Sequence, residues 1–201
     1  MRAFWIILIA GCGFHSPPGT TTDPDAGPDT DNPGSGQCPA SYDVTKLPGP
    51  SHYRLIVDGH RAWEQSDDCN DDLPGSTRLV VIETRKEFDD ISAYIKTGLG
   101  TAMDSVWIGA VQLPTAATVD TDWLGFDGAP LFDGWGGSEP NDNNTSNPDE
   151  ANHEEQFVRM TRTNPPYFID DSGPKMFGAI CECDGKPIAA TVPALINGYR
   201  P

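Results

Sequence analysis

The sequence predicts a single α+β domain of two helices and small antiparallel sheets, with a long irregular loop and stapling disulfides. Three observations predict this fold class. Two segments, within 60–70 and 88–95, carry apolar residues at helical spacing. Several short apolar runs have the length and composition of strands. Four cysteines fall within the same block, 38–183, and an even number of cysteines in an exported chain favours disulfides.

The N-terminus resembles a bacterial lipoprotein signal. Arg2 is followed by the apolar run 3–10, which is shorter than the roughly 20 residues that a membrane-spanning helix needs. Residues 9–12, Ile-Ala-Gly-Cys, resemble a lipobox, which would make 1–11 the signal peptide and Cys12 the lipidation site. We therefore expect an extracytoplasmic protein, lipid-anchored to the bacterial envelope at the outer membrane. An ordinary secretory signal is the alternative interpretation.

Residues 12–37 are expected to form a disordered tether behind the lipidated cysteine. The segment is rich in Pro, Gly, Asp and Thr and has almost no apolar residues that could form a core. Such a composition cannot bury enough surface to offset the entropy of ordering. The tether would hold the folded domain away from the membrane, so that the lipid is its only membrane contact.

The charge of the chain excludes one class of partner. With 30 acidic and 13 basic residues, the formal net charge is −17, and a protein this acidic repels the phosphates of nucleic acids. Carboxylates can also serve as oxygen ligands of calcium. An enzyme is not expected, because His52, His60 and His153 lack ligand spacing and no nucleophile–base pattern stands out.

The first half of the block predicts alternating strands and helices. Residues 53–57 are typical of a strand, and 60–70 of a helix, which Pro74-Gly75 would end. The run 79–82 is typical of a buried strand. Thr84 and Glu87 then form a capping box for a second helix, whose apolar face includes Phe88, Ile91 and Ile95 and which Gly98 and Gly100 would close.

The second half predicts short strands around a long loop. Strands are expected at 106–111, 157–161 and 178–181, and about 45 residues separate the first two. A connection of this length in a compact domain is usually functional or disordered. The segment 184–201 is a C-terminal extension that either packs on the domain or remains loose.

In their order, these features resemble the C-type lectin-like family over residues 38–183. Each match alone is weak, but several in the family's order are specific. The matches are a first-helix pattern that ends in a cysteine, the central WIG strand, a Trp…Asp-Gly…Trp pattern, the EPN triplet and the terminal strand. They fall at 62–69, 106–109, 123–135, 139–141 and 179–182, respectively.

The resemblance implies a disulfide pairing that the cysteine count alone leaves open. Four cysteines allow three connectivities, and we expect Cys181 and Cys183, two residues apart, to bond different partners. The family's whole-domain disulfide corresponds to Cys69 with Cys181, which leaves Cys38 for Cys183. The family's inner disulfide is missing, because its positions correspond to Gln156 and Gly173.

The resemblance also implies a calcium site that binds sugar. In the family, the glutamate and asparagine of EPN, here Glu139 and Asn141, hold calcium and hydrogen-bond vicinal hydroxyls of mannose-type sugars. A further glutamate corresponds to Glu154, with Glu150 and Glu155 as alternatives. Calcium takes six to eight oxygens, so more ligands are needed.

The remaining ligands depart from the family pattern. The family's Asn-Asp pair aligns with Ile169 and Asp170, so one oxygen ligand is missing unless the register slips to Asp170 and Asp171. The interval between Asn141 and Glu154 is also about seven residues longer than usual and rich in Asp and Asn.

From these matches we expect a non-catalytic module that binds a carbohydrate or glycoconjugate with the help of Ca²⁺. The alternative is a calcium-independent protein–protein recognition or adhesion module with a degenerate sugar site. The long loop would then serve as the surface that contacts the protein partner.

Overall fold

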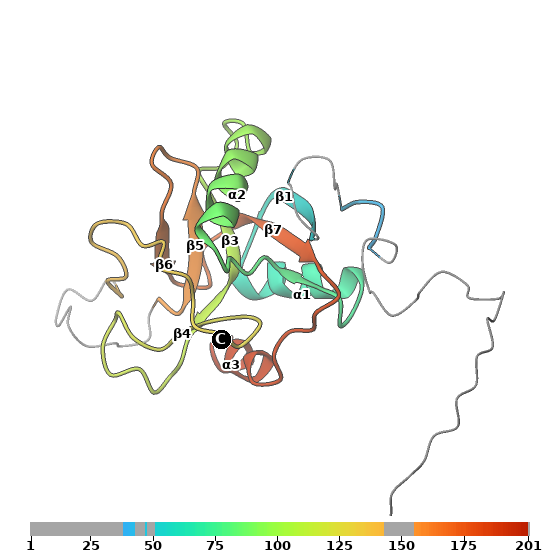
Figure 1. Cartoon of the computed structure of the whole chain (residues 1–201). Coiled ribbons are helices and arrows are strands. Elements are labelled where there is room, and N and C mark those ends of the chain that lie inside the picture. Colours follow the sequence, from blue (N-terminus) through green and yellow to red (C-terminus); the bar gives the residue numbers. More distant parts are fainter. Residues whose placement is uncertain (1–37, 43–46, 48–50, 143–154, 201) are drawn as a thin grey trace, which may run out of the picture. The chain divides into compact units, whose positions relative to one another are not determined.

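The computed structural model describes residues 38–42, 47, 51–142 and 155–200 (Figure 1). The expected signal peptide, Cys12, the tether, Glu150 and Glu154 lie outside the described residues. The helices are α1 (Ala62–Asp72), α2 (Arg85–Gly98) and α3 (Val192–Gly198). The strands are β1 (His52–His60), β2 (Thr77–Leu79), β3 (Ser105–Gln112), β4 (Trp123–Gly125), β5 (Phe157–Thr161), β6 (Phe168–Asp171) and β7 (Phe177–Cys183).

The described strands form one mixed sheet. Its order is β1-β7-β3-β5-β6, with β2 also paired to β7 and β4 to β3. The β3–β7 pair is parallel and the other pairs are antiparallel. The expected α+β fold is thereby confirmed, and its mainly antiparallel sheet is mixed at one pair because the last strand inserts beside β3 in the middle of the sheet.

Alternating side chains of β3 divide the core between the two faces of the sheet. Val106, Ile108 and Ala110 belong to one apolar cluster, which includes the buried face of α2. Trp107 and Val111 belong to a second cluster, which includes residues of α1 and α3. This alternation is what the period of a strand dictates when both of its faces are buried.

Another segment of the chain approaches β3 closely at Gly109. A Cβ there would lie 2.6 Å from the backbone oxygen of Leu79 and 3.0 Å from that of Val80. The N–H of Gly109 donates to the Val80 oxygen at 2.7 Å. The glycine of the WIG segment therefore allows the chain after β2 to cross directly against β3.

Two disulfides close the domain in the pairing implied by the resemblance. Cys38 is bonded to Cys183, and Cys69 to Cys181. Gly173, at a position of the absent inner disulfide, packs between aromatic rings, and an added Cβ would lie 2.7 Å from both Trp63 and Phe157. No cysteine side chain fits there without displacing those rings.

The first helix and the second strand are among the elements whose limits differ from the sequence expectation. The first helix spans Ala62–Asp72 instead of 60–70, because β1 continues to His60, and the side chain of Glu64 accepts the N–H of Arg61 at 3.0 Å to begin the helix. The strand expected at 79–82 is instead Thr77–Leu79. Val80, Val81 and Ile82 are buried, as their apolar run indicates, but they follow β2 and are not part of its pairing with β7.

The C-terminal extension packs on the domain and contains a third helix, which was not expected. Val192 and Ile196 of α3 are buried in the second cluster. The N–H of Ala189 donates to Phe126 at 2.7 Å, which joins the extension to the turn after β4, and Figure 1 shows α3 at that end of the domain. No helix among the described residues is long and apolar enough to cross a membrane.

Candidate functional site

The EPN triplet lies on the loop that leads away from β4. The Glu139–Pro140 peptide bond is cis, and the side-chain amide of Asn141 donates to the Glu139 carboxylate. The two side chains therefore face the same side of the loop, where a carboxylate and an amide are presented together.

The loop reaches β6 because the segment before it pairs with that strand. The N–H of Phe168 donates to Gly134 at 2.8 Å, and the N–H of Gly136 donates to Phe168 at 3.2 Å. The Trp135 ring lies 5.9 Å from the Phe168 ring, whose side chain is fully buried in the first cluster. These contacts place residues 139–142 beside the end of β6.

Asp170 of β6 holds the loop through backbone hydrogen bonds. Its carboxylate oxygens each accept the N–H of Asn141 at 3.0 Å, and one also accepts the N–H of Asp142 at 2.6 Å. Asp170 is only 1% exposed. Glu139, Asn141 and Asp170, three of the four expected ligands, are therefore brought together, whereas Glu154 lies beyond the part of the chain that the structure describes.

Asp142, which directly follows the EPN triplet and begins the Asp- and Asn-rich interval, belongs to the site although it is not one of the four expected ligands. It is buried with a positive φ of 50°, and its carboxylate accepts the N–H of Glu155 at 2.9 Å. The bond joins the two described residues that flank 143–154 and places Glu155 next to the loop. Asparagine and aspartate tolerate this left-handed backbone best among residues other than glycine.

The slipped register, with Asp171 in the site, is not what the structure shows. Asp171 forms an ion pair of 2.7 Å with Arg159 and a further one with Lys175. Neighbouring residues of a strand face opposite sides of the sheet. Asp170 therefore faces the loop at 139–142, and Asp171 faces away from it. Ile169 is half-buried and has no oxygen in its side chain, so the ligand that the family expects there is absent.

The carboxylates of the loop crowd one another. Burial raises the pKa of Glu139 well above its usual value, and contact with the Asp170 carboxylate raises it further, while Arg159 lowers it. Burial and the charges of Asp170 and Asp171 raise the pKa of Glu155 to about 7. Among the described residues, neither Glu139 nor Asp170 has an ion pair with Lys or Arg, so the cluster favours a proton or an added cation.

The donor chemistry fits calcium in kind. Carboxylate and amide oxygens are the hard ligands that calcium takes, and Glu139, Asn141 and Asp170 supply them together. Among the described residues, however, there is no group of three Asp, Glu, His or Cys side chains close enough together to hold a metal ion. Binding would thus require side-chain movement or oxygens from other residues.

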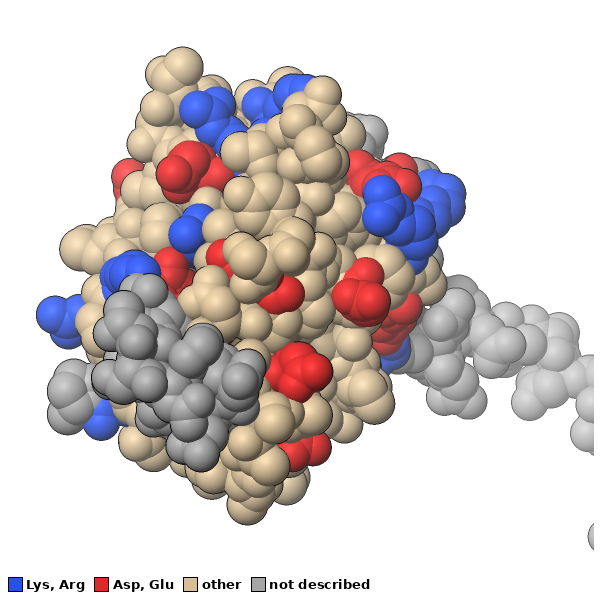
Figure 2. All heavy atoms as spheres, turned by 90° about the vertical axis from the view of Figure 1, so that its left-hand side faces the viewer, with Lys and Arg blue, Asp and Glu red and all other residues tan. Residues whose placement is uncertain are grey.

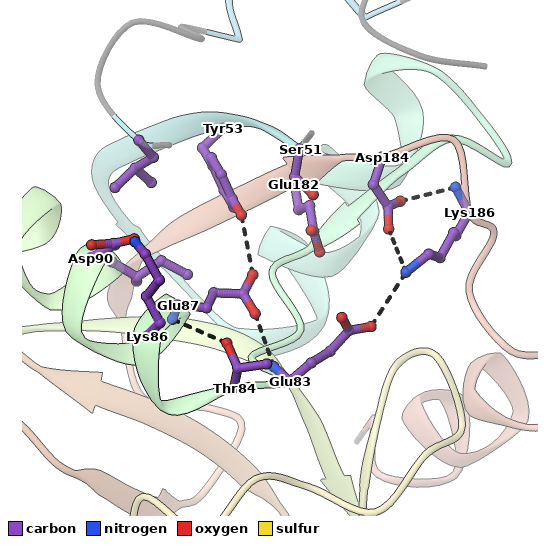
Figure 3. Close-up of a pocket in the computed structure, with 12 residues that line it drawn as sticks. Ser51, Tyr53, Glu83, Thr84, Lys86, Glu87, Asp90, Glu182, Asp184 and Lys186 are labelled. Carbon is purple, nitrogen blue, oxygen red and sulfur yellow. Dashed lines mark hydrogen bonds and ion pairs between the residues drawn. The ribbon is translucent and has the colours of Figure 1, made fainter. Parts of the chain in front are cut away.

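A separate cavity of about 400 Å³ lies between β1, the start of α2 and the residues around the end of β7 (Figure 3). The charged groups that line it have hydrogen-bond or ion-pair partners. Lys186 lies 3.3 Å from Glu83 and 3.4 Å from Asp184, and the Tyr53 hydroxyl donates to Glu87 at 3.1 Å. Because the charged groups of this cavity already have partners, we take the loop at 139–142 as the candidate site.

On the face that carries β6, the described residues form no large region of a single charge. Figure 2 shows its acidic side chains in separate groups on a mostly uncharged surface, with basic side chains toward the edges. The carboxylates of Asp142, Glu155 and Asp170 contribute little to this surface because they are buried. Their charge therefore acts within the site.

The fold is C-type lectin-like, as comparison with solved structures shows. The C-type lectin CEL-I from Cucumaria echinata is similar with a TM-score of 0.58 and 18% identity, over 73% of this chain and 96% of that one. The mouse scavenger receptor C-type lectin carbohydrate-recognition domain has a TM-score of 0.55 and 19% identity, over 73% and 98%. A calcium-independent type II antifreeze protein has a TM-score of 0.53 and 22% identity, over 73% and 94%.

No protein-family model matches the sequence, and no curated protein matches it. At these identities the structural likeness concerns the fold. It spans both a carbohydrate-recognition domain and a calcium-independent antifreeze protein, so the function has to be argued from the site.

Proposed function

We propose that the protein is a non-catalytic, extracytoplasmic binding module that takes carbohydrate hydroxyls at Glu139 and Asn141 with the help of Ca²⁺. The observation that carries this proposal is the arrangement of the loop: a carboxylate and an amide face the same side, and Asp170 holds the backbone beneath them. The two disulfides support an oxidising compartment, and attachment through lipid at Cys12 is part of the proposal.

Each residue has a distinct part in this function. The Glu139 carboxylate can accept a hydrogen bond from one sugar hydroxyl, while the Asn141 amide can donate to its neighbour. Asp170 keeps the two side chains in place by fixing the backbone N–H groups of the loop. Bound Ca²⁺ would neutralise the crowded carboxylates and coordinate the same hydroxyls. The EPN triplet favours equatorial, mannose-type hydroxyls by resemblance.

The second candidate is calcium-independent recognition of a protein. It is favoured by Ile169, which supplies no oxygen where the family has a ligand, and by the absence of a preformed metal cluster among the described residues. In this case the loop surface would contact a protein partner directly, and its carboxylates would be stabilised by protons and by Arg159 and Lys175.

Calorimetric titration of Ca²⁺ into the purified chain, beside Glu139→Gln, separates the two candidates. We expect the native chain to bind Ca²⁺ and the variant to bind at least about tenfold more weakly, because a charged ligand is lost. Glu83→Gln, the same change at an exposed carboxylate paired with Lys186, should bind as the native chain does. Binding of a mannose-rich glycan should then require Ca²⁺ and disappear on chelation.

Absence of calcium binding by the native chain would overturn the calcium-assisted proposal and favour protein recognition. Equal calcium binding by the native chain and Glu139→Gln would show that any metal lies elsewhere in the molecule.

A further inference from the structure

Lys175 approaches the candidate site from the turn between β6 and β7. Its backbone N–H donates to Ser172 at 3.1 Å, which forms the turn. Its ammonium group lies 3.6 Å from the carboxylate of Glu155 and pairs with that of Asp171. The Lys175 side chain is 49% exposed, whereas those of Glu155 and Asp171 are 8% and 1% exposed. A half-exposed cation thus neutralises two buried carboxylates.

The two carboxylates depend on Lys175 to different extents. Asp171 also pairs with Arg159 at 2.7 Å and accepts the N–H of Ser172 at 2.8 Å. For Glu155, Lys175 is the one ion-pair partner among the described residues. Loss of the Lys175 charge would therefore leave Asp171 paired and release Glu155.

Glu155 is joined to the loop that holds the candidate ligands. Its N–H donates to Asp142, whose own N–H donates to Asp170. Its charge also lies near enough to raise the pKa of Glu139. Glu155 can therefore serve as an oxygen ligand beside Glu139 and Asp170, but only if its carboxylate leaves Lys175.

We propose that Lys175 is a built-in competitor of calcium, which pairs with Glu155 in the metal-free protein and leaves that carboxylate when the ion binds. This inference rests on the proposed function of the loop. An ammonium group and Ca²⁺ repel each other, and both are attracted to the Glu155 carboxylate. Each therefore weakens the binding of the other to it. The lysine stabilises the metal-free site and lowers its affinity for calcium.

The test is calorimetric titration of Ca²⁺ into the native chain, Lys175→Gln and Lys175→Arg, with Lys186→Gln as the matched control. Lys186→Gln removes the same charge but from a side chain that pairs with Glu83 and Asp184. We expect Lys175→Gln to bind Ca²⁺ roughly tenfold more tightly than the native chain, because one nearby positive charge is removed. Lys175→Arg and Lys186→Gln should stay within about twofold of the native affinity, because each leaves the local charge unchanged.

A second measurement uses the native chain and does not depend on a variant that folds. Acetylation of Lys175 by a limiting amine-reactive reagent, followed by mass spectrometry, should become faster when Ca²⁺ is added, while acetylation of Lys186 stays the same. Loss of the Glu155 contact would leave the ammonium group with Asp171 alone and expose it more to the reagent.

The outcomes distinguish this inference from the proposed function. If the native chain binds Ca²⁺ and Lys175→Gln binds it no more tightly, or if acetylation of Lys175 is unchanged by calcium, the competitor role is overturned and the calcium site stands. If only Lys175→Gln binds Ca²⁺, the native lysine blocks the site outright, and both its displacement by calcium and the calcium-assisted function are overturned. If no chain binds Ca²⁺, both ideas fail together.

Discussion

The carboxylate of Asp170 accepts the backbone N–H of Asn141 through both of its oxygens, each at 3.0 Å. This contact joins the last residues of β6 to a loop 29 positions earlier in the chain. A buried carboxylate bonded to backbone N–H groups forms strong, charge-assisted hydrogen bonds. The loop is thus held by the protein itself before any ligand arrives, which reduces the cost of binding.

The first prediction concerns this contact. Asp170→Ala should speed the hydrogen exchange of the Asn141 and Asp142 amides and lower the free energy of unfolding by about 1–3 kcal/mol, because their acceptor is lost. Asp170→Asn keeps one acceptor oxygen and should have an intermediate effect. Amide exchange followed by NMR measures both. The amide of Val80, bonded to Ile180, serves as an internal control, and unchanged exchange at 141 and 142 in Asp170→Ala would contradict this role of Asp170.

Much of the fold could be predicted because its signals are local or come in a specific order. Phe88, Ile91 and Ile95 repeat at helical spacing and are indeed the buried face of α2. Glu139 and Asn141 stand in a triplet that the resemblance recognises, and the loop does bring them together. Such features need no knowledge of distant contacts.

What could not be predicted depends on contacts between distant residues. Arg78 is charged, yet it is fully buried because Asp184 and Glu182 reach it from the end of β7. The helix α3 has seven residues, and its propensity alone is weak; packing of Val192 and Ile196 on the second cluster stabilises it. Lys175 in sequence is an ordinary surface lysine, and only the fold places it beside Glu155.

The second prediction concerns Tyr199, which joins the C-terminal extension to the sheet. Its hydroxyl donates to the backbone oxygen of Gln112 at 3.0 Å, and its ring packs edge-on against Phe157 at 5.9 Å. Tyr199→Phe should lower the free energy of unfolding in urea by about 1 kcal/mol. Tyr199→Ala should cost more, about 2–3 kcal/mol, because the ring contact is lost as well.

Asn197→Ala provides the control for Tyr199, since it changes an exposed residue of α3, the helix that Tyr199 directly follows, and should leave the urea midpoint nearly unchanged. If Tyr199→Ala is as stable as the native chain, the extension does not contribute to the stability of the domain.

The third prediction concerns Glu182, which faces Arg78 across the β2–β7 ladder. The two side chains form an ion pair of 3.3 Å within the core, and Glu182 is 4% exposed. Burial raises the pKa of Glu182 to about 7, since the attraction of Arg78 does not offset the loss of hydration, and the charge of Asp184 raises it further. Between this value and the ordinary 4.5, the folded protein binds the proton that the unfolded chain releases.

Stability should therefore increase as the pH falls from 8 to 5, and Glu182 contributes up to about 3 kcal/mol of that change at 1.36 kcal/mol per pKa unit. Glu182→Gln resembles the protonated acid at every pH, so it should equal the native chain near pH 5 and exceed it near pH 8. Urea unfolding at both pH values, with a chelator present to exclude metal binding, measures the difference. A difference between the two chains that stays the same at pH 5 and pH 8 would mean that Glu182 remains charged throughout and that Arg78 compensates fully for its burial.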